Sequence, residues 1–261
     1  MLTYPHIDPI IFRIGPLAVR WYGLMYLLGF LAAYVLIRFL ARYRQLDVTS
    51  DQVADLLFYC VLGVIAGGRL GYVLFYDPVF YFNHPWQILA VWQGGMSFHG
   101  GLLGVVVAVL WWCRHTGNRI LLTGDILVTA SSVGLGLGRI GNFINGELWG
   151  RTTQLPWGMV FPGAGPLPRH PSQLYEAVLE GVVLFGILWL LHLRRAAIGV
   201  PFFAFLACYG CFRFLIELVR EPDAHIGLLW GTISMGQLLS APMILVGIVG
   251  VWYCWRRAMQ P

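Results

Sequence analysis

The sequence predicts an all-α integral membrane protein with seven transmembrane helices and a small external arm or head region. Hydrophobic residues occupy 58% of the 261 positions, charged residues only 11%, and the mean hydropathy is +0.71. A soluble domain carries about 25% charged residues. Several apolar runs reach about 18 residues or more, the length that an α-helix needs to cross a bilayer. These observations together predict a single membrane domain over residues 1–261.

Turn-forming and helix-starting residues divide the apolar sequence into segments. Such signals stand at residues 47–51, Asp77 and 116–118, and Ser172 is the expected N-cap of a later helix. The predicted spans lie near 17–38, 53–76, 96–113, 123–144, 172–192, 199–219 and 233–255. Residues 145–171 form the predicted external arm.

The arginines set the predicted orientation. With seven spans, one side of the membrane receives nine of them: Arg38, Arg42, Arg44, Arg114, Arg119, Arg194, Arg195, Arg256 and Arg257. The positive-inside rule makes that side cytoplasmic, so the C-terminus is cytoplasmic and the N-terminus external. Tryptophans near the span ends, such as Trp21 and Trp252, are typical of an aromatic belt.

The cations also exclude some functions. The chain has 17 arginines and no lysine, which rules out Schiff-base chemistry and a lysine general base. The arginines are scattered among apolar segments rather than gathered in a stripe, so no nucleic-acid partner is expected. The guanidinium fork suits bidentate binding of phosphate or carboxylate.

Polar residues gather at the end of the fourth predicted span. Arg139 and Asn142 share one helical face, Asn145 follows three residues later, and Glu147 lies beyond Gly146, which is expected to end the helix. Ionisable groups at membrane depth are costly and usually functional. The alternative is a helix end whose arginine reaches out to the interface, but that alternative leaves four hydrogen-bonding groups together unexplained.

A second polar set lies on the sixth predicted span. Tyr209, Arg213 and Glu217 follow one another at intervals of four residues, and Arg213 and Glu217 can pair. A self-neutralised structural ion pair is the alternative to a functional role. A buried pair is weak evidence for stability, which favours function.

Five further residues need an explanation in the predicted membrane region. His99 begins the third span and Tyr22 the first, where structural roles are the default. Arg69 lies inside the second span and needs a partner or a water-filled cavity. Glu176 and Glu180 form an i, i+4 acidic pair on the fifth span.

Other motifs carry little chemistry. Gly134 and Gly138 form a G-x-x-x-G that indicates close helix packing. Cys208 and Cys211 form a C-x-x-C on a predicted membrane helix, where packing is the expected role. Metalloprotease, nucleophile-elbow and P-loop motifs are absent from the sequence, so neither a metal nor a cofactor is expected.

Arginines, amides, a histidine and a glutamate near one membrane face favour an anionic ligand with a lipid part, because guanidinium forks match a phosphodiester.

The chain resembles the bacterial prolipoprotein diacylglyceryl transferases. The resemblance rests on seven stretches in order: WYGLMYLLGF (21–30), GGRLGYVLFY (67–76), GGMSFHGGLLG (94–104), GRIGNFINGELWG (138–150), RHPSQLYEAVLEG (169–181), YGCFRFLIELVREPD (209–223) and SMGQLLS (234–240). Together they extend over nearly the whole length. Arg20, where relatives often have histidine, and a short 151–168 arm differ from the family pattern.

The resemblance implies transfer of the diacylglyceryl group of phosphatidylglycerol to the lipobox cysteine of a preprolipoprotein signal peptide, with release of glycerol phosphate. It implies a bacterial inner-membrane protein with its site toward the outer, periplasmic leaflet and its N-terminus in the periplasm. The implied catalytic residues are His99 as base, with Arg139 and Arg213 as phosphate ligands. The expected substrate-binding residues are Tyr22, Asn142, Asn145, Glu147, Gly150, Tyr209, Glu217 and Arg69.

The proton acceptor for the thiol stays open between His99, a thiolate stabilised by arginine, and Tyr22. The alternative function is a lipid or anion transporter with arginines along a translocation route. It predicts polar groups in both halves of the membrane, whereas here they concentrate toward one face. A non-catalytic scaffold leaves the polar groups of three spans unexplained.

Overall fold

A computed structural model describes residues 2–5, 7–221, 227–229 and 231–259. The chain forms two compact units, one of residues 1–40 and 124–261 and the other of residues 41–123, which are described in turn. Its helices are α1 (Trp21–Tyr43), α2 (Ser50–Phe75), α3 (Pro78–Asn83), α4 (Phe98–Thr116), α5 (Ile120–Asn145), α6 (Ser172–Glu176), α7 (Leu184–Leu193), α8 (Val200–Ile216) and α9 (Met235–Ala258). Shorter turns are η1 (Pro85–Leu89), η2 (Val91–Gln93) and the π-helical η3 (Ala177–Val183), and the strands are β1 (Ile10–Ile14), β2 (Leu17–Arg20), β3 (Leu228–Leu229) and β4 (Ile233–Ser234).

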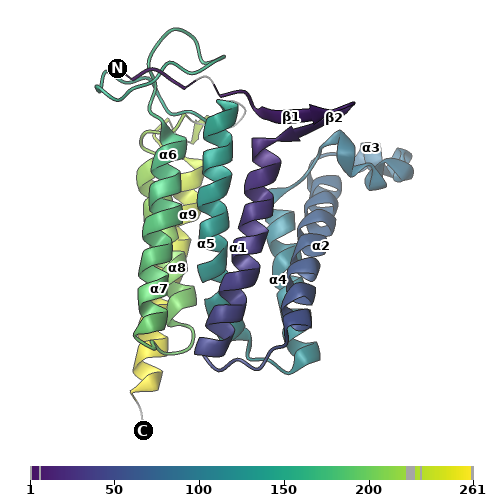
Figure 1. Cartoon of the computed structure of the whole chain (residues 1–261), viewed down its shortest axis with the longest axis vertical. Coiled ribbons are helices and arrows are strands. Elements are labelled where there is room, and N and C mark those ends of the chain that lie inside the picture. The colour runs from purple at the N-terminus through teal and green to yellow at the C-terminus, as the bar shows by residue number, and fades with distance from the viewer. Residues whose placement is uncertain (1, 6, 222–226, 230, 260–261) are drawn as a thin grey trace. The chain divides into compact units, whose positions relative to one another are not determined.

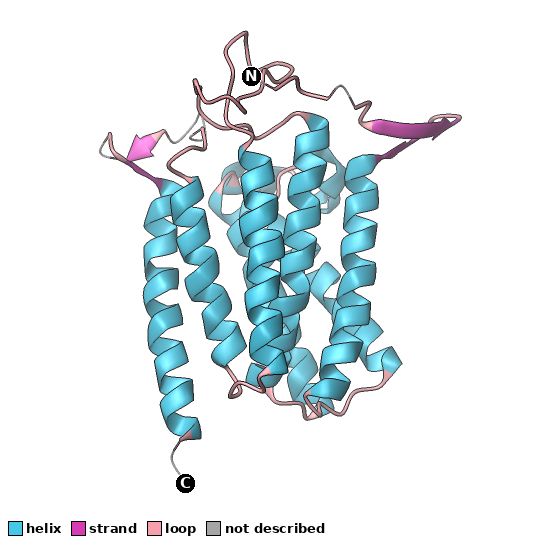
Figure 2. Cartoon of the chain, turned by 60° about the vertical axis from the view of Figure 1, so that its left-hand side comes forward, coloured by secondary structure: helices cyan, strands magenta, loops and turns pink. Residues whose placement is uncertain are grey.

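Helices dominate the described chain, and the strands are short (Figure 2). A helix occupies each of the seven predicted segments. In the described residues, five helical segments are long and apolar enough to cross a membrane: α1, α2, α5, the continuous α6–η3–α7 and α9. The apolar α8 has 17 residues, and the 19-residue α4 carries His99 near its start and Arg114 near its end. The chain is therefore an α-helical membrane protein, and the count of seven spans stays a prediction.

In the first unit, the first helix begins later than the sequence predicted. Residues 17–20 were expected to open the first span, but they form β2, which pairs antiparallel with β1. Gly15 lies in the connecting turn with φ +58°, a conformation that glycine adopts without strain. The apolar run before Trp21 thus belongs to a hairpin. The sequence analysis assigned it to the helix because hydrophobicity alone does not distinguish a short strand from the start of a helix.

Helices α5, α7, α8 and α9 of this unit run alongside one another, with α1 beside α5 (Figure 1). The N-terminal segment is fixed to the end of α5 by Tyr4, whose hydroxyl donates to the carbonyls of Phe143 and Ile144 at 2.7 and 3.1 Å. Tyr4 also packs with Phe143, Met159 and Phe161 in a small buried cluster. Burial raises the pKa of Tyr4, so its hydroxyl stays protonated and keeps its donor role.

Close backbone approach in this unit occurs at a glycine pair other than the predicted one. A Cβ on Gly134 or Gly138 would meet no described atom within 4 Å. A Cβ on Gly136, in contrast, would lie 3.0 Å from the Cα of Gly181 in η3. The G-x-x-x-G motif does lie at a helix contact, since a Cβ on Gly29 of α1 would be 3.4 Å from the Cα of Gly134, but the tighter contact is made by the residue between its two glycines.

The helix that begins at residue 172 starts differently from the expectation. Pro171 is its N-cap, and Ser172 is the first helical residue. The Ser172 hydroxyl donates to the carbonyl of Leu148 at 3.0 Å instead of capping the helix. This bond ties the arm segment to the start of α6.

A buried carboxylate, that of Asp125, links the start of α5 to the N-terminus of α8. Asp125, fully buried near the start of α5, accepts hydrogen bonds from the backbone N–H groups of Gly199 and Phe202 at 2.8 and 2.9 Å. These groups belong to the N-terminus of α8, where a negative charge also interacts favourably with the helix dipole.

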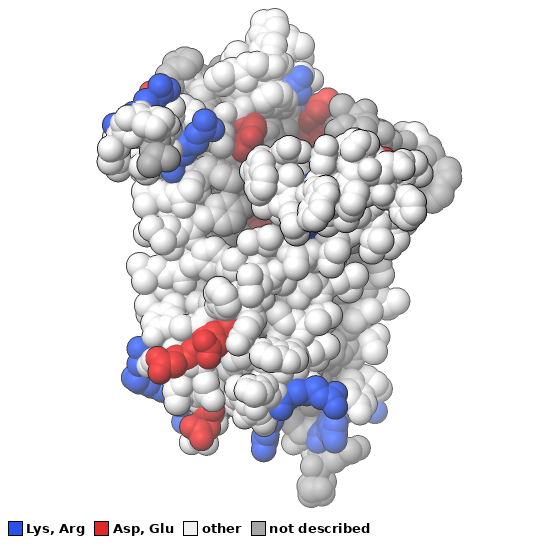
Figure 3. All heavy atoms as spheres, turned by 90° about the vertical axis from the view of Figure 1, so that its right-hand side faces the viewer, with Lys and Arg blue, Asp and Glu red and all other residues white. Residues whose placement is uncertain are grey.

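In the second unit, α2 and α4 pack through glycines. A Cβ on Gly71 would lie 2.9 Å from the Cα of Gly100, and Gly63 is in similarly close contact with Gly104. Apolar side chains of both helices, such as Phe58 and Val107, remain exposed. The face drawn in Figure 3 is uncharged over most of its area, as expected for contact with lipid.

Candidate active site

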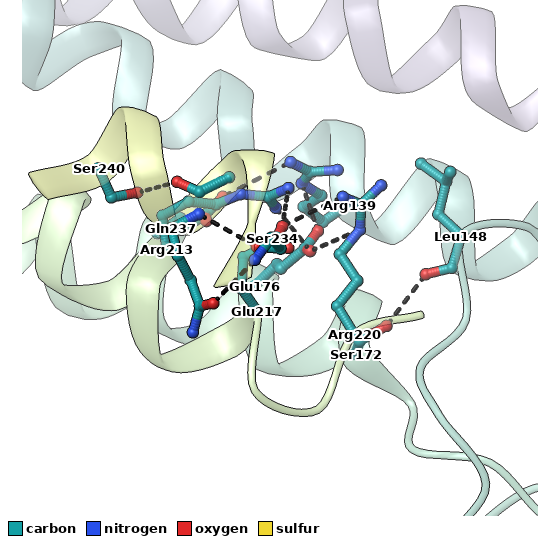
Figure 4. A network of polar contacts seen from close by, with 12 residues as sticks. Arg139, Leu148, Ser172, Glu176, Arg213, Glu217, Arg220, Ser234, Gln237 and Ser240 are labelled. Carbon is teal, nitrogen blue, oxygen red and sulfur yellow. Dashed lines mark hydrogen bonds and ion pairs between the residues drawn. The ribbon is translucent and has the colours of Figure 1, made fainter. Parts of the chain in front are cut away.

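Six charged side chains of the first unit form one buried cluster (Figure 4). They are Arg139 of α5, Glu176 of α6, Glu180 of η3, Arg213 of α8, and Glu217 and Arg220 just after α8. Figure 4 shows the side chains of Arg139, Arg213 and Arg220 converging on Glu176 and Glu217. We call these six residues the Arg–Glu cluster.

Glu176 is the centre of the cluster. One of its oxygens lies 2.7 Å from Nε of Arg139, and the other lies 3.1 Å from Nη1 of Arg213. Arg220 Nε is 3.8 Å from the same carboxylate. A single carboxylate thus brings guanidinium groups from α5 and α8 together.

A second carboxylate, that of Glu217, pairs with both Arg213 of α8 and Arg220 just after α8. Glu217 lies 3.2 Å from Nη1 of Arg220 and also pairs with Arg213, the i, i+4 pair that the sequence predicted. A Cβ on Gly236 of α9 would lie 2.6 Å from the Glu217 carboxyl carbon, so α9 covers this carboxylate closely.

The two kinds of charge differ in exposure. The side chains of Glu176, Glu180 and Glu217 are 0%, 0% and 3% exposed, whereas those of the arginines retain 11–19%. Removing a buried charge's partner typically costs about 3–5 kcal/mol, yet an intact pair contributes little net stability. A functional role therefore explains the cluster better than a contribution to folding stability does. Its arginines are partly exposed, so they can bind an anion.

Local backbone features place Arg139 beside its partners. The Gly136–Gly181 contact brings α5 against η3, one turn before Arg139. π-helical turns inside helices are frequent at functional sites. Here η3 begins immediately after Glu176 and contains Glu180, so the irregular turn carries the acidic pair.

The tyrosines predicted for the site lie near the cluster. Tyr22 packs on Gly141, where a Cβ would come within 2.8 Å of its ring, and its hydroxyl lies 3.2 Å from that of Tyr26. Tyr26 in turn is close enough to Arg139 to interact with its charge. Tyr209 interacts electrostatically with Glu180 and stacks on Phe205 at 5.6 Å.

Asn142, Asn145 and Glu147 form a connected group where α5 ends. Both amides donate to the same Glu147 carboxylate oxygen, at 2.9 and 3.2 Å. Gly146 has φ +67° and ends the helix, as predicted. Gln173 donates to the Glu147 carbonyl, which ties this group to α6. The carboxylate of this exposed residue is thus held in one orientation.

Gly150 lies between two backbone segments. Its N–H donates to the carbonyl of His170 at 2.9 Å, and it forms an antiparallel bridge with Arg220. A Cβ here would lie 2.5 Å from the Val219 carbonyl oxygen. Only glycine fits, and through this contact the arm positions Arg220.

His99 and Arg69 belong to the second unit. His99 is exposed on the first turn of α4 and makes an edge-to-face contact with Phe98. Arg69 is 4% exposed, and its guanidinium donates to the backbone carbonyls of Gln87, Ile88, Gly94 and Gly95. The sequence predicted either a partner or a water-filled cavity for Arg69, and the structure supplies a partner, the backbone of η1 and of Gly94 and Gly95 before α4.

Three residues of the cluster were not predicted as site residues. The spacing of Glu176 and Glu180 was visible in the sequence, but nothing there paired them with Arg139. Arg220 lies seven residues after Arg213, which is two helical turns, and this spacing was the available sequence signal that the two arginines lie on one side of the helix.

Within the described residues, no group of three or more His, Cys, Asp or Glu side chains is arranged to hold a metal ion.

The helices and the buried Arg–Glu cluster define an α-helical membrane protein with a buried polar site that contains three arginines. The family model described as "Prolipoprotein diacylglyceryl transferase" matches residues 9–253. Relatives named phosphatidylglycerol–prolipoprotein diacylglyceryl transferase occur in Geobacter sulfurreducens (56% identical, 100% of each chain), Oleidesulfovibrio alaskensis (54%, 100% of this chain and 98% of the relative) and Coxiella burnetii (52%, 98% and 99%). The chain belongs to the prolipoprotein diacylglyceryl transferase family, as its sequence stretches predicted.

Proposed function

We propose that this chain transfers the diacylglyceryl group of phosphatidylglycerol to the thiol of a lipobox cysteine in a preprolipoprotein signal peptide. The sulfur attacks the glyceryl carbon that is bonded to the phosphate oxygen. A thioether forms, the carbon–oxygen bond breaks, and glycerol phosphate leaves. The names of full-length relatives support a transferase over the alternative transporter.

One observation carries the proposal: the guanidinium groups of Arg139 and Arg213 lie on the two oxygens of Glu176 and stay partly open. Two arginines held this close can bind one phosphodiester from two sides. As the bond to carbon breaks, negative charge grows on the phosphate. Preorganised cations stabilise that charge without reorganisation.

The nucleophile needs a proton acceptor. A free thiol has a pKa of about 8.5, and the thiolate is the reactive form. His99 is our proposed base, since it is exposed at the start of α4 and a neutral imidazole nitrogen can accept the thiol proton. A thiolate stabilised by arginine and proton transfer to Tyr22 are the alternatives.

The remaining predicted residues receive supporting roles in this proposal. We assign lipid or peptide positioning to Tyr22, Asn142, Asn145, Glu147, Gly150, Tyr209 and Glu217. Arg69 was expected to bind substrate, but backbone carbonyls occupy its guanidinium. Its proposed role is therefore to hold residues 87–95 in place before His99.

We further propose that the protein crosses the bacterial inner membrane seven times as one domain, with residues 145–171 and the site on the periplasmic side. The arginine distribution supports this orientation. In the first unit, the N-terminal segment and the end of α9 lie at opposite ends, as an odd number of crossings requires (Figure 1).

The test is reconstitution of the purified full-length chain with phosphatidylglycerol and a lipobox peptide. Mass spectrometry of the peptide detects the thioether adduct, and an enzymatic assay measures released glycerol phosphate. Arg139→Ala and Arg213→Ala are expected to lower turnover at least about 100-fold, the typical loss for one preorganised group that stabilises charge. Arg256→Ala is the matched control, because its guanidinium lies over the Trp252 ring near the C-terminal end of α9 and forms no ion pair with the Arg–Glu cluster among the described residues.

Normal turnover by either cluster variant would remove the phosphate assignment. Lipid movement across vesicles without any thioether product would instead favour the transporter.

A further inference from the structure

Glu180 differs from the other carboxylates of the Arg–Glu cluster. Its side chain is fully buried, and neither carboxyl oxygen has a hydrogen-bond donor among the described residues. Its nearest cation is Nη2 of Arg139 at 3.7 Å. Glu176, in contrast, has arginine nitrogens at 2.7 and 3.1 Å on its two oxygens. Glu180 is therefore the least compensated charge in the cluster.

Burial without hydrogen bonds strongly disfavours an ionised carboxylate. The cost of an isolated buried charge is so large that such a group generally takes the neutral form. A second effect acts in the same direction, because Glu176 contacts the same guanidinium and its negative charge repels a second one. The opposing groups are Arg139, Arg213 and Arg220, and the phenol of Tyr209 also faces Glu180.

The protonation of Glu180 decides the charge of the site. Three arginines and three ionised glutamates sum to zero, whereas a neutral Glu180 leaves a net charge of +1. A phosphodiester carries one negative charge. A lipid whose head group also bears an ammonium group is neutral overall, and its cation would be repelled by a positive site.

We propose that Glu180 is held as an uncharged carboxylic acid, so that the Arg–Glu cluster has a net charge of +1 and selects a lipid phosphodiester without a compensating cation. Glu180 thereby acts as a specificity-determining residue through the arginines, without contacting the lipid. This inference rests on the proposed function for the identity of the lipid, but the charge state can be measured without any transfer reaction.

The first measurement is infrared spectroscopy of the full-length chain without substrate at neutral pH. We expect a carboxylic-acid C=O band that shifts in D₂O and that Glu180→Gln removes. Glu221→Gln is the matched control, since the Glu221 side chain is 48% exposed. This substitution is expected to remove a carboxylate band instead of a carboxylic-acid band. Loss of a carboxylate band in Glu180→Gln would overturn the proposal. If that variant does not fold, absence of any acid band in the wild-type protein overturns it equally.

The second measurement is binding of short-chain phosphatidylglycerol and phosphatidylethanolamine as a function of pH. Wild-type affinity for phosphatidylglycerol is expected to fall about tenfold or more as the pH rises through the ionisation of Glu180, because one unit of attractive charge disappears. Glu180→Gln cannot ionise, so this alkaline weakening is expected to vanish. Persistence of the weakening in the variant would refute the assignment.

The two proposals fail separately. Binding with the expected pH dependence but without thioether formation would leave this inference standing and remove the transferase function. Normal transfer by a protein that shows no acid band would remove this inference alone.

Discussion

Substitution of Gly136 by alanine tests whether the contact between α5 and η3 sets the geometry of the Arg–Glu cluster. The added Cβ would lie 3.0 Å from the Cα of Gly181. Non-bonded carbons prefer about 3.5–4.0 Å, so the two backbones must separate by about 0.5–1 Å. Overpacking of this kind costs about 1–3 kcal/mol.

The displacement acts on the site because Arg139 lies one turn after Gly136, and Glu180 directly precedes Gly181. The 2.7 Å distance between Arg139 and Glu176 joins α5 to the last residue of α6, which continues directly into η3. A misplacement of about 1 Å can cost about 100-fold in rate. We expect Gly136→Ala to lower thioether formation about 10- to 100-fold while the protein still inserts and folds.

Gly134→Ala provides the matched control. It lies on the same helix two residues earlier, and its Cβ would meet no described atom within 4 Å. The assay is the reconstituted transfer reaction, with circular dichroism to verify helix content in both variants. Equal turnover by Gly136→Ala and wild type would refute the argument that this contact positions Arg139.

Three further predictions follow from contacts outside the cluster. Gly150→Ala would place a Cβ 2.7 Å from that of His170, and we expect at least a tenfold loss of transfer in the same assay. Asp125→Ala removes the hydrogen bonds that cap α8, and denaturant titration should show about 2–3 kcal/mol lower stability. Burial lowers the pKa of His170 in the folded protein below the unfolded-state pKa of about 6.5. The contribution of neutral His170 to folding stability is therefore complete above about pH 6.5 and is lost as the pH falls through the lower folded-state pKa. Thermal unfolding should therefore show a larger loss on acidification for the wild type than for His170→Gln.

Much of the helical framework could be predicted from the sequence because two local signals mark it. Apolar runs locate the helices, and capping residues locate their starts. Thr49 and Ser234 each form a capping box at the start of a helix, and Asp77 caps α3. The β1–β2 hairpin and the π-helical turn η3 could not be predicted this way. The hairpin is local, but hydropathy does not distinguish a short strand from the start of a helix. The η3 turn lies where Gly181 meets Gly136 of α5, a distant contact that hydropathy does not report.

The candidate site shows the same division. Arg213 and Glu217 lie four residues apart, so their pairing could be predicted from helix geometry. The pairing of Arg139 with Glu176 joins residues 37 positions apart on different helices, and no local pattern encodes it. A polar residue in an apolar helix therefore signals that a partner exists, while the identity of that partner requires the fold.

The two membrane-depth arginines Arg69 and Arg139 show why the partner matters for function. Both were anomalies in the sequence for the same energetic reason. Arg69 is 4% exposed and donates from all three guanidinium nitrogens to backbone carbonyls, so it has little capacity left for a ligand. Arg139 is held by carboxylates and keeps 19% of its side chain accessible. Carbonyl partners stabilise a guanidinium without neutralising it, whereas a carboxylate shared with Arg213 holds two cations side by side. That second arrangement leaves both guanidinium groups able to bind an incoming phosphate, which is the reason we propose a functional role for Arg139 and a structural one for Arg69.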